Sequence, residues 1–286
     1  MALDSELDRD EVVALIRTAL DEDLRYGPDI TTAATVPADA VAKASVVPRQ
    51  PGTVAGLDVG LLVLDEVIGA GNYEVTERVA DGTRVVPGQS VLTVAAPTRG
   101  LLTAERTMLN LVCHLSGIAT ATAAWVDAVA GTDCKIRDSR KTLPGLRALQ
   151  KYAVRVGGGV NHRMGLGDAA LIKDNHVAAA GSVVEALRAV RALARDIACE
   201  VEVDSLEQLD AVLAENVELV LLDNFPLWQT QSAVQRRNAV APQTKLESSG
   251  GLSLEVAAEY AGTGVDYFAV GALTHSVRVL DLGLDM

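Results

Sequence analysis

Basic side chains follow three consecutive short apolar runs in the second half of the sequence. Arg140, Arg163 and Lys173 each stand just after one of these runs. Because ligands of parallel α/β folds sit at the carboxyl ends of the strands, we expect the three cations to line a site for an anion. An arginine suits a planar carboxylate and a lysine suits a phosphate, so the pattern predicts a ligand that carries such groups.

The charge of the surrounding segment supports this prediction. Residues 135–163 hold eight Lys and Arg against one acid, Asp138, which gives a local charge of +7 in a chain whose net charge is −13. A solvated charged face is the alternative, and it is the usual explanation of a charge run. The negative overall charge and an aromatic content of 3% argue against binding to nucleic acid or to anionic lipid.

Acidic side chains stand at the ends of the next two runs. These are Glu202 and Asp223. Two hard carboxylates beside a phosphate site suit Mg²⁺ that is shared with the phosphates of a substrate. The alternatives are that they neutralise Lys141 or Lys173, that they act through water, or that they contact ribose hydroxyls.

Small residues follow the last two runs, in the loops 249–251 and 271–272. Glycine there lets backbone N–H groups approach a phosphate closely, and α/β barrels commonly hold a phosphate at this place. A single Gly-Gly pair more often marks a turn, but two such loops after adjacent runs favour a phosphate site. His162 and His275 lie at or just past strand ends, and we expect them to hydrogen-bond the substrate.

The predicted secondary structure that positions these residues changes near Gly131. Before it, the apolar spacing predicts a helix over 10–24, short strands within 41–95, a helix near 58–70 and helical patterns over 101–130. After it, short β runs alternate with helical stretches, most of them about 20 to 30 residues apart, as in repeated β/α units.

Seven β runs lie after Gly131, and they predict a compact, incomplete α/β barrel with about six to seven parallel strands. The runs are 134–137, 159–161, 169–172, 199–203, 218–222, 244–248 and 266–270. The gap between the second and third runs is too short for a crossover helix, so the array is irregular. A doubly wound open sheet is the alternative, but no G-x-G-x-x-G follows a first strand.

The composition is that of a folded chain with a large core. The 286 residues are 49% hydrophobic and 22% charged, which excludes a disordered polymer. Three cysteines without a C-x-x-C motif predict reduced thiols in a cytoplasmic protein, with neither a disulfide framework nor a zinc site. The acidic start is unlike a signal peptide, and no run of 18 apolar residues predicts a membrane span.

Seven motifs, in order along the chain, resemble those of the quinolinate phosphoribosyltransferase family. They are TAERTMLNLVCHLSGIAT, DSRKTLPGLR, KYAVRVGGGVNHR, LIKDNH, LLDN, ESSGG and GALTHS, preceded by GPDITT, which is similar to the family's GDITT with a Pro inserted. The resemblance covers nearly the whole chain. The sequence departs from the family at Ser139 and Leu143, where Thr is usual, and at Ser248, where Ala is usual; Ser139 keeps the hydroxyl and Leu143 does not.

The resemblance implies a role for each matching residue. The implied quinolinate site is Arg106, Ser139, Arg140, His162, Arg163 and Lys173, with Arg106 supplied by the second subunit of a homodimer. The implied phosphoribosyl pyrophosphate site is Lys141, Lys173, Glu202, Asp223, Ser249, Gly250, Gly251, Gly271, Ala272 and His275. Lys141, Glu202 and Asp223 are the implied catalytic residues, and Glu202 and Asp223 the implied Mg²⁺ ligands, directly or through water.

The resemblance also implies a fold and a reaction. The expected fold class is α/β, with an N-terminal α/β sandwich over 1–116 and an incomplete α/β barrel over 117–275, and with a tail, 276–286, that packs on the first domain. The expected reaction transfers phosphoribosyl from phosphoribosyl pyrophosphate to quinolinate with loss of CO₂, in de novo NAD biosynthesis. No organic cofactor is expected, and assembly of dimers into hexamers is left open.

Four other interpretations remain open from the sequence. A relative encoded with molybdate-transport genes would act on a different base, and a nicotinate phosphoribosyltransferase would need one carboxylate clamp fewer. A barrel aldolase would use Lys173 as its Schiff base. A binding protein would keep the anion pocket without chemistry.

Overall fold

The computed structural model of the chain describes residues 3–286, and these residues form two compact units. The first unit is built from the chain up to Ala123, Leu143–Gly158 and Ser276–Met286. The second unit comprises Ala124–Thr142 and Gly159–His275. The chain therefore passes between the units several times, whereas the resemblance implied one boundary before residue 117 and a returning tail.

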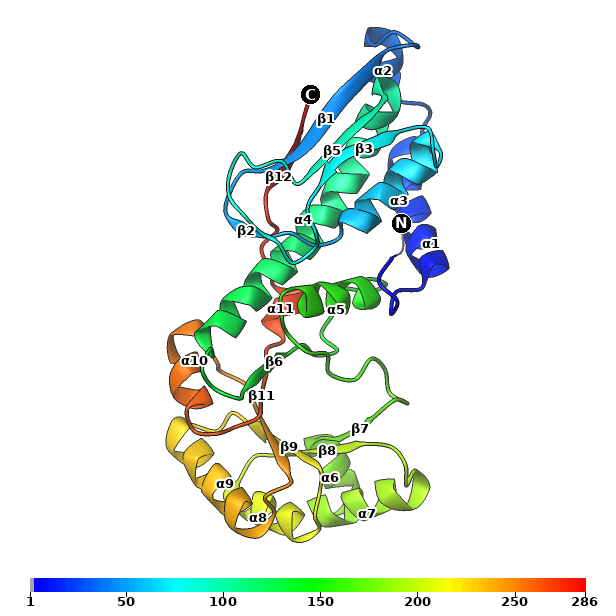
Figure 1. Ribbon diagram of the computed structural model, residues 1–286. Coiled ribbons are helices and arrows are strands. Elements are labelled where there is room, and N and C mark those ends of the chain that lie inside the picture. The colour runs from blue at the N-terminus through cyan, green and yellow to red at the C-terminus, as the bar shows by residue number, and fades with distance from the viewer. Residues whose placement is uncertain (1–2) are drawn as a thin grey trace. The chain divides into compact units, whose positions relative to one another are not determined.

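The first unit contains an antiparallel sheet with the strand order β12-β1-β5-β3. Its elements are α1 (Arg9–Leu24), α2 (Ile30–Thr35), β1 (Val41–Pro48), β2 (Gly52–Thr53), α3 (Leu57–Ile68), β3 (Glu74–Arg78), β4 (Arg84–Val85), β5 (Leu92–Pro97), most of α4 (Thr98–Ala128), α5 (Arg147–Val156) and β12 (Leu282–Asp285). In β1 the alternation places Val46 opposite both Leu92 and Leu284, and helices α3 and α4 pack beside the sheet (Figure 1). This layering is the expected N-terminal α/β sandwich.

Segment 143–158 belongs to the first unit because α5 packs closely against its core. A Cβ added at Gly157 would lie 2.5 Å from the backbone oxygen of Ala119, so only glycine allows this approach. The Tyr152 hydroxyl donates a hydrogen bond to Asp81, whose carboxylate also accepts from the N–H groups at the start of α3. These contacts join parts of the chain that are far apart in sequence.

The apolar composition of helix α4 is explained by the burial of the helix. It is long and apolar enough to cross a membrane by length and composition, but 56% of the apolar window is buried inside the protein. Gly117 lies against the backbone of Arg278 and Val279, where an added Cβ would come within 2.3 Å of the Arg278 oxygen. Its apolar residues are thus those of a core helix.

The second unit is an open sheet of parallel strands covered by helices, with the strand order β6-β11-β10-β9-β8-β7 among the described residues. Its elements are β6 (Lys135–Arg137), β7 (Ala170–Ile172), α6 (Asp174–Ala180), α7 (Val183–Leu193), β8 (Cys199–Val203), α8 (Leu206–Ala214), β9 (Leu219–Asp223), α9 (Leu227–Val240), β10 (Lys245–Ser249), α10 (Leu254–Ala261), β11 (Tyr267–Ala269) and α11 (Ala272–His275). Helices α6 to α10 lie along the outer face of the curved sheet (Figure 1). The incomplete α/β barrel is confirmed.

The expected run 159–161 forms no full strand. Val160 makes a single parallel bridge to Arg137 at the edge of β6, and the chain then crosses to β7 without a helix. The sheet therefore stays open between its edge strands β6 and β7, because the connection is too short to hold a β/α unit there.

The alternation of residues in the short strands points charged side chains inward. In β8, Cys199, Val201 and Val203 are buried, and Glu200 and Glu202 alternate with them on the other face. Glu202 lines the pocket described below, so this face is the concave side of the sheet. The interior of the open barrel is thus largely polar.

Candidate functional site

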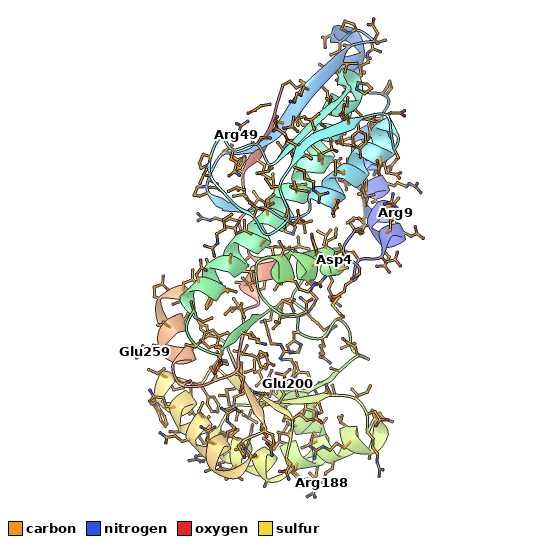
Figure 2. The ribbon with its side chains drawn as sticks, viewed as in Figure 1. Asp4, Arg9, Arg49, Arg188, Glu200 and Glu259 are labelled. Carbon is orange, nitrogen blue, oxygen red and sulfur yellow. The ribbon has the colours of Figure 1, made fainter. Side chains whose placement is uncertain are left out.

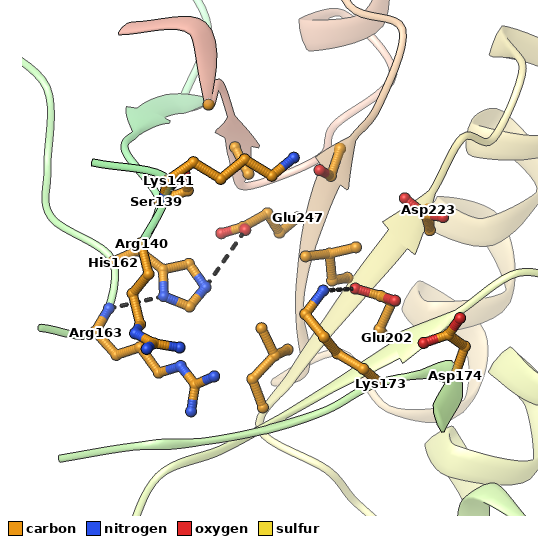
Figure 3. Close-up of a pocket in the computed structure, with 15 residues that line it drawn as sticks. Ser139, Arg140, Lys141, His162, Arg163, Lys173, Asp174, Glu202, Asp223 and Glu247 are labelled. Atoms are coloured by element: carbon orange, nitrogen blue, oxygen red, sulfur yellow. Dashed lines mark hydrogen bonds and ion pairs between the residues drawn. The ribbon is translucent and has the colours of Figure 1, made fainter. Parts of the chain in front are cut away.

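A pocket of about 540 Å³ lies at the carboxyl ends of the parallel strands of the second unit (Figure 3). It is lined by Ser139, Arg140, Lys141, His162, Arg163, Leu171, Lys173, Asp174, Glu202, Leu221, Asp223, Glu247, Ser249, Ala269 and Gly271. Most of the predicted site residues therefore come together in one cavity, as the strand-end argument requires.

Two arginines form one end of the pocket. Arg140 follows β6, Arg163 lies in the connection to β7, and their side chains run side by side (Figure 3). The Nε atoms of both are buried and have no hydrogen-bond partner. Burial and the neighbouring charge of Arg140 lower the pKa of Arg163. This end of the pocket thus carries positive charge that the protein does not neutralise, which suits an anionic ligand.

Asp138 holds the two arginine-bearing segments together. Its buried carboxylate accepts hydrogen bonds from the backbone N–H of His162 at 2.8 Å and from the side-chain amide of Asn161. The one acid in the basic segment therefore binds a backbone N–H and a side-chain amide, and these two contacts involve neither Arg140 nor Arg163.

Acidic side chains and lysines form the opposite end of the pocket. Lys173 Nζ lies 2.5 Å from Glu202 Oε2, Asp223 accepts from the side chain of Asn224 at 2.9 Å, and Lys141 reaches in from the β6 side (Figure 3). The two carboxylates offer the hard oxygen donors that Mg²⁺ prefers, and their small number leaves room for phosphate and water ligands. The residues therefore fit a magnesium ion that is shared with a phosphorylated substrate.

The glycine loops border this end. Gly250 and Gly251 have φ of 82° and 65°, and a Cβ on Gly250 would lie 2.1 Å from Asn224 Oδ1. Gly271 lies close to Lys141 and His275, at 3.1 and 3.3 Å from its ideal Cβ position. The loops therefore depend on glycine both for conformation and for space.

Five predicted site residues lie outside the pocket lining. Gly250, Gly251, Ala272 and His275 stand next to lining residues in the sequence or in space. Arg106 lies in the first unit, on α4, where its side chain is exposed.

The basic segment contributes fewer cations to the pocket than its charge suggested. Lys151 is fully buried, and Arg155 pairs with Asp4 and Glu6 in the first unit. Arg137 pairs with Glu247 at 2.5 Å. Local charge counting could not separate these roles, because they depend on which unit each side chain enters.

Sequence reasoning missed a buried polar cluster beneath the pocket. We call Arg137, His162, Glu200 and Glu247 the floor cluster. His162 Nε2 lies 2.7 Å from Glu200 Oε2 and 3.8 Å from Glu247 Oε1. Burial raises the pKa of both glutamates to about 7, with Arg137 opposing the shift. The signal was available in the sequence, as acids alternating with apolar residues in CEVEV and KLESS.

The floor cluster also contains a set of possible metal ligands. Within the described part of the chain, the ligand atoms of His162, Glu200 and Glu247 lie within 4.8 Å of one another. A direct contact from His162 to Glu200 and the hydrogen bond from the Arg137 guanidinium to Glu247 already account for two of the polar contacts in this cluster.

The chain matches two family sequence models over most of its length. The model of the quinolinate phosphoribosyl transferase N-terminal domain matches residues 29–116, and that of the C-terminal domain matches residues 118–285. Nicotinate-nucleotide pyrophosphorylase [carboxylating] of Mycobacterium leprae is 73% identical over 282 residues, which is 99% of each chain. The human protein of the same name is 34% identical and aligns with 96% of this chain and 91% of its own.

Solved structures agree with the sequence relatives. NadC of Streptococcus pyogenes superimposes with a TM-score of 0.92 at 37% identity, covering 100% of this chain and 98% of its own. Human nicotinic acid phosphoribosyltransferase gives a TM-score of 0.63 at 16% identity, covering 98% of this chain and 75% of its own. The second likeness shows a shared fold alone.

Proposed function

The chain belongs to the quinolinate phosphoribosyltransferase family, and from this premise we propose how its pocket divides the work of the reaction. The enzyme transfers phosphoribosyl from phosphoribosyl pyrophosphate to quinolinate with decarboxylation, and forms nicotinate mononucleotide, pyrophosphate and CO₂ in NAD biosynthesis. The proposal concerns the roles of individual residues, the metal ion and the assembly.

The arginine end takes quinolinate. Quinolinate is a pyridine with two adjacent carboxylates, and Arg140 and Arg163 offer it two buried guanidinium Nε atoms without partners. The assignment rests on this pair of arginines without carboxylate partners, because binding a dianion relieves the repulsion between two like charges in an empty pocket. Ser139 and His162 line the same pocket, and Lys173 faces quinolinate from the opposite end.

The opposite end takes phosphoribosyl pyrophosphate. Lys141 and Lys173 face the pyrophosphate, and the loops 249–251 and 271–272 with His275 hold the 5′-phosphate through backbone N–H groups. Glu202 and Asp223 hold Mg²⁺, directly or through water. When bound, the ion neutralises charge on the pyrophosphate as it leaves.

The residues of the chain act mainly by position and charge. The pyridine nitrogen attacks C1 of the ribose as the bond to pyrophosphate breaks, and Arg140 with Arg163 holds the ring against C1. Lys141 stabilises the negative charge that develops on the leaving group. No general base is needed, because the ring nitrogen is already unprotonated. Loss of CO₂ leaves the electron pair of the broken bond on C2 of the ring, where the adjacent positively charged nitrogen stabilises it as an ylide, and protonation of that carbon completes the product.

The working enzyme is a homodimer in this proposal, with Arg106 entering the site of its partner. An exposed arginine on a core helix fits such a role. Mixing Arg106→Ala and Lys141→Ala proteins tests it, because a hybrid dimer would contain one site free of both changes. Recovered activity is expected; none in a mixture that is shown to exchange subunits would exclude a shared site. Hexamers remain a further possibility, and the cytoplasm is the proposed compartment.

A turnover assay tests the residue assignments together with the reaction. The purified protein is incubated with quinolinate, phosphoribosyl pyrophosphate and Mg²⁺, and CO₂ and pyrophosphate are measured together. Equal amounts of both products, with quinolinate and not with nicotinate, are expected. Pyrophosphate without CO₂, or equal activity on nicotinate, would contradict the assignment of the arginine end to a dicarboxylate.

A further inference from the structure

The floor cluster borders the substrate pocket, and two of its members, His162 and Glu247, line it. Its members come from four separate segments: Arg137 from β6, Glu200 from β8, Glu247 from β10 and His162 from the connection between the edge strands. Glu247 has no exposed side-chain surface and Glu200 is 4% exposed. Glu200 is not among the residues that line the pocket, and Glu247 borders it with no exposed surface, so we consider a role of this pair that acts through a neighbour.

The hydrogen bonds of His162 determine the state of its ring. Nδ1 accepts a hydrogen bond from the backbone N–H of Arg163 at 2.7 Å. A nitrogen that accepts from an N–H carries no proton of its own, so the ring proton is on Nε2 and points to Glu200 at 2.7 Å. His162 is therefore neutral in this geometry, and both of its ring nitrogens are occupied by protein groups.

Each carboxylate contributes a separate constraint on this ring. Glu200 accepts the Nε2 proton, and Glu247 Oε1 lies 3.8 Å from the same nitrogen. Glu247 is itself held by Arg137, whose guanidinium also stacks over the ring of Tyr267 at 4.8 Å. Asp138 holds the backbone N–H of His162 from the loop side. The imidazole thus has little freedom to rotate.

The orientation of His162 in turn places Arg163. The Nδ1 contact holds the backbone at Arg163, and the guanidinium of Arg163 donates to the Ala169 carbonyl at 2.9 Å. The segment carrying Arg163 has no strand pairing beyond the single bridge at Val160. The ring of His162 therefore supplies order that the short connection lacks.

We propose that Glu200 and Glu247 are positioning residues for quinolinate, because they hold His162 as a neutral imidazole that fixes Arg163 in the pocket. The inference rests on the proposed assignment of Arg163 to quinolinate. It differs from the expectation that His162 hydrogen-bonds the substrate: the ring supplies geometry, and the arginines supply the charge.

The state of the ring is tested directly by nitrogen NMR of ¹⁵N-histidine-labelled wild-type protein. The chain contains four histidines, and a His162→Gln variant identifies the signal. The expected signal at neutral pH is a neutral ring with its proton on Nε2, unchanged on addition of diamagnetic Zn²⁺ without substrate. An imidazolium signal, a proton on Nδ1, or loss of the signal at stoichiometric metal would overturn the proposal. The result does not depend on which residues bind quinolinate.

Kinetics test whether the ring positions the substrate. Glu200→Gln keeps an oxygen acceptor for the Nε2 proton, so the KM for quinolinate should stay within about threefold of the wild type. Glu200→Leu removes the acceptor and should raise that KM roughly tenfold or more, the size expected when a buried donor loses its partner. The KM for phosphoribosyl pyrophosphate should change little in either variant.

A matched control separates this effect from general damage. Glu259→Leu makes the same substitution at an exposed position on α10, outside the pocket lining, and should leave both KM values unchanged. Equal quinolinate KM values for Glu200→Leu and wild type, or equal losses for both substrates, would contradict a positioning role.

Discussion

Replacing Arg140 by methionine should weaken catalysis and leave the empty protein at least as stable. Methionine keeps the part of the side chain up to about the position of Nε and removes the charged guanidinium. In the structure, the Arg140 Nε is buried without a partner, and the charge of Arg140 helps to lower the pKa of Arg163. The guanidinium therefore makes no compensating bond there, and removing it relieves a repulsion between like charges.

The loss of activity follows from the contacts that a guanidinium can make to a carboxylate. Each hydrogen bond from a charged donor contributes about 1.5–3 kcal/mol, and a bidentate pair makes two. A loss of at least about 3 kcal/mol corresponds to a fall in kcat/KM for quinolinate on the order of 10²-fold or more. The melting temperature of the ligand-free variant should equal or exceed that of the wild type.

The assay combines steady-state kinetics for both substrates with thermal unfolding. Arg188→Met is the matched control, because Arg188 lies on the outer rim of the second unit, paired with Glu215, while Glu200 lies inside (Figure 2). The control should keep wild-type kinetics. A fall in kcat/KM of less than threefold for Arg140→Met would remove Arg140 from the site, and a clearly lower melting temperature would refute the account of unneutralised charge.

Four further expectations follow from the same structure. Phthalate, a dicarboxylate analogue of quinolinate, should raise the melting temperature, since a ligand at 100 times its Kd stabilises by about 2.7 kcal/mol; an unchanged melting curve at saturation would count against the anion pocket. Gly250→Ala should raise the KM for phosphoribosyl pyrophosphate roughly tenfold or more, because the new Cβ would clash with Asn224. Gly251→Asn should have a small effect, because asparagine tolerates a φ of 65° and the space around that position is open. Equal kinetics for the two variants would refute this steric account. Ser248→Ala should stabilise the protein by about 1 kcal/mol in thermal unfolding, because the Ser248 hydroxyl is buried without a partner, and a destabilised variant would show that the hydroxyl is satisfied. Burial raises the pKa of Glu247 from 4.5 to about 7, so between these pH values the folded chain binds more protons than the unfolded chain, and stability falls as the pH rises. The melting temperature of Glu247→Gln should therefore fall less than that of the wild type between about pH 5.5 and 8. An equally steep fall in both proteins would contradict this account.

The kind of chemistry was readable from residue types and their order. Arg140, Lys173, Glu202 and Asp223 were predicted to meet because each follows an apolar run, and the carboxyl ends of parallel strands share one edge of a sheet. The motif order identified the family, and the family models and relatives confirm the predicted family and reaction. These are local or strictly sequential features, so one chain is enough to read them.

Only the tertiary structure decided which charges remain available. Arg137 and Arg140 are three positions apart in the same basic segment, yet one is neutralised by Glu247 and the other has a buried nitrogen without a partner. Lys151, in the same segment, is buried in the first unit. Alternation within a strand separates its two faces, but the long-range pairing of strands determines which face is enclosed and which acid meets which cation there.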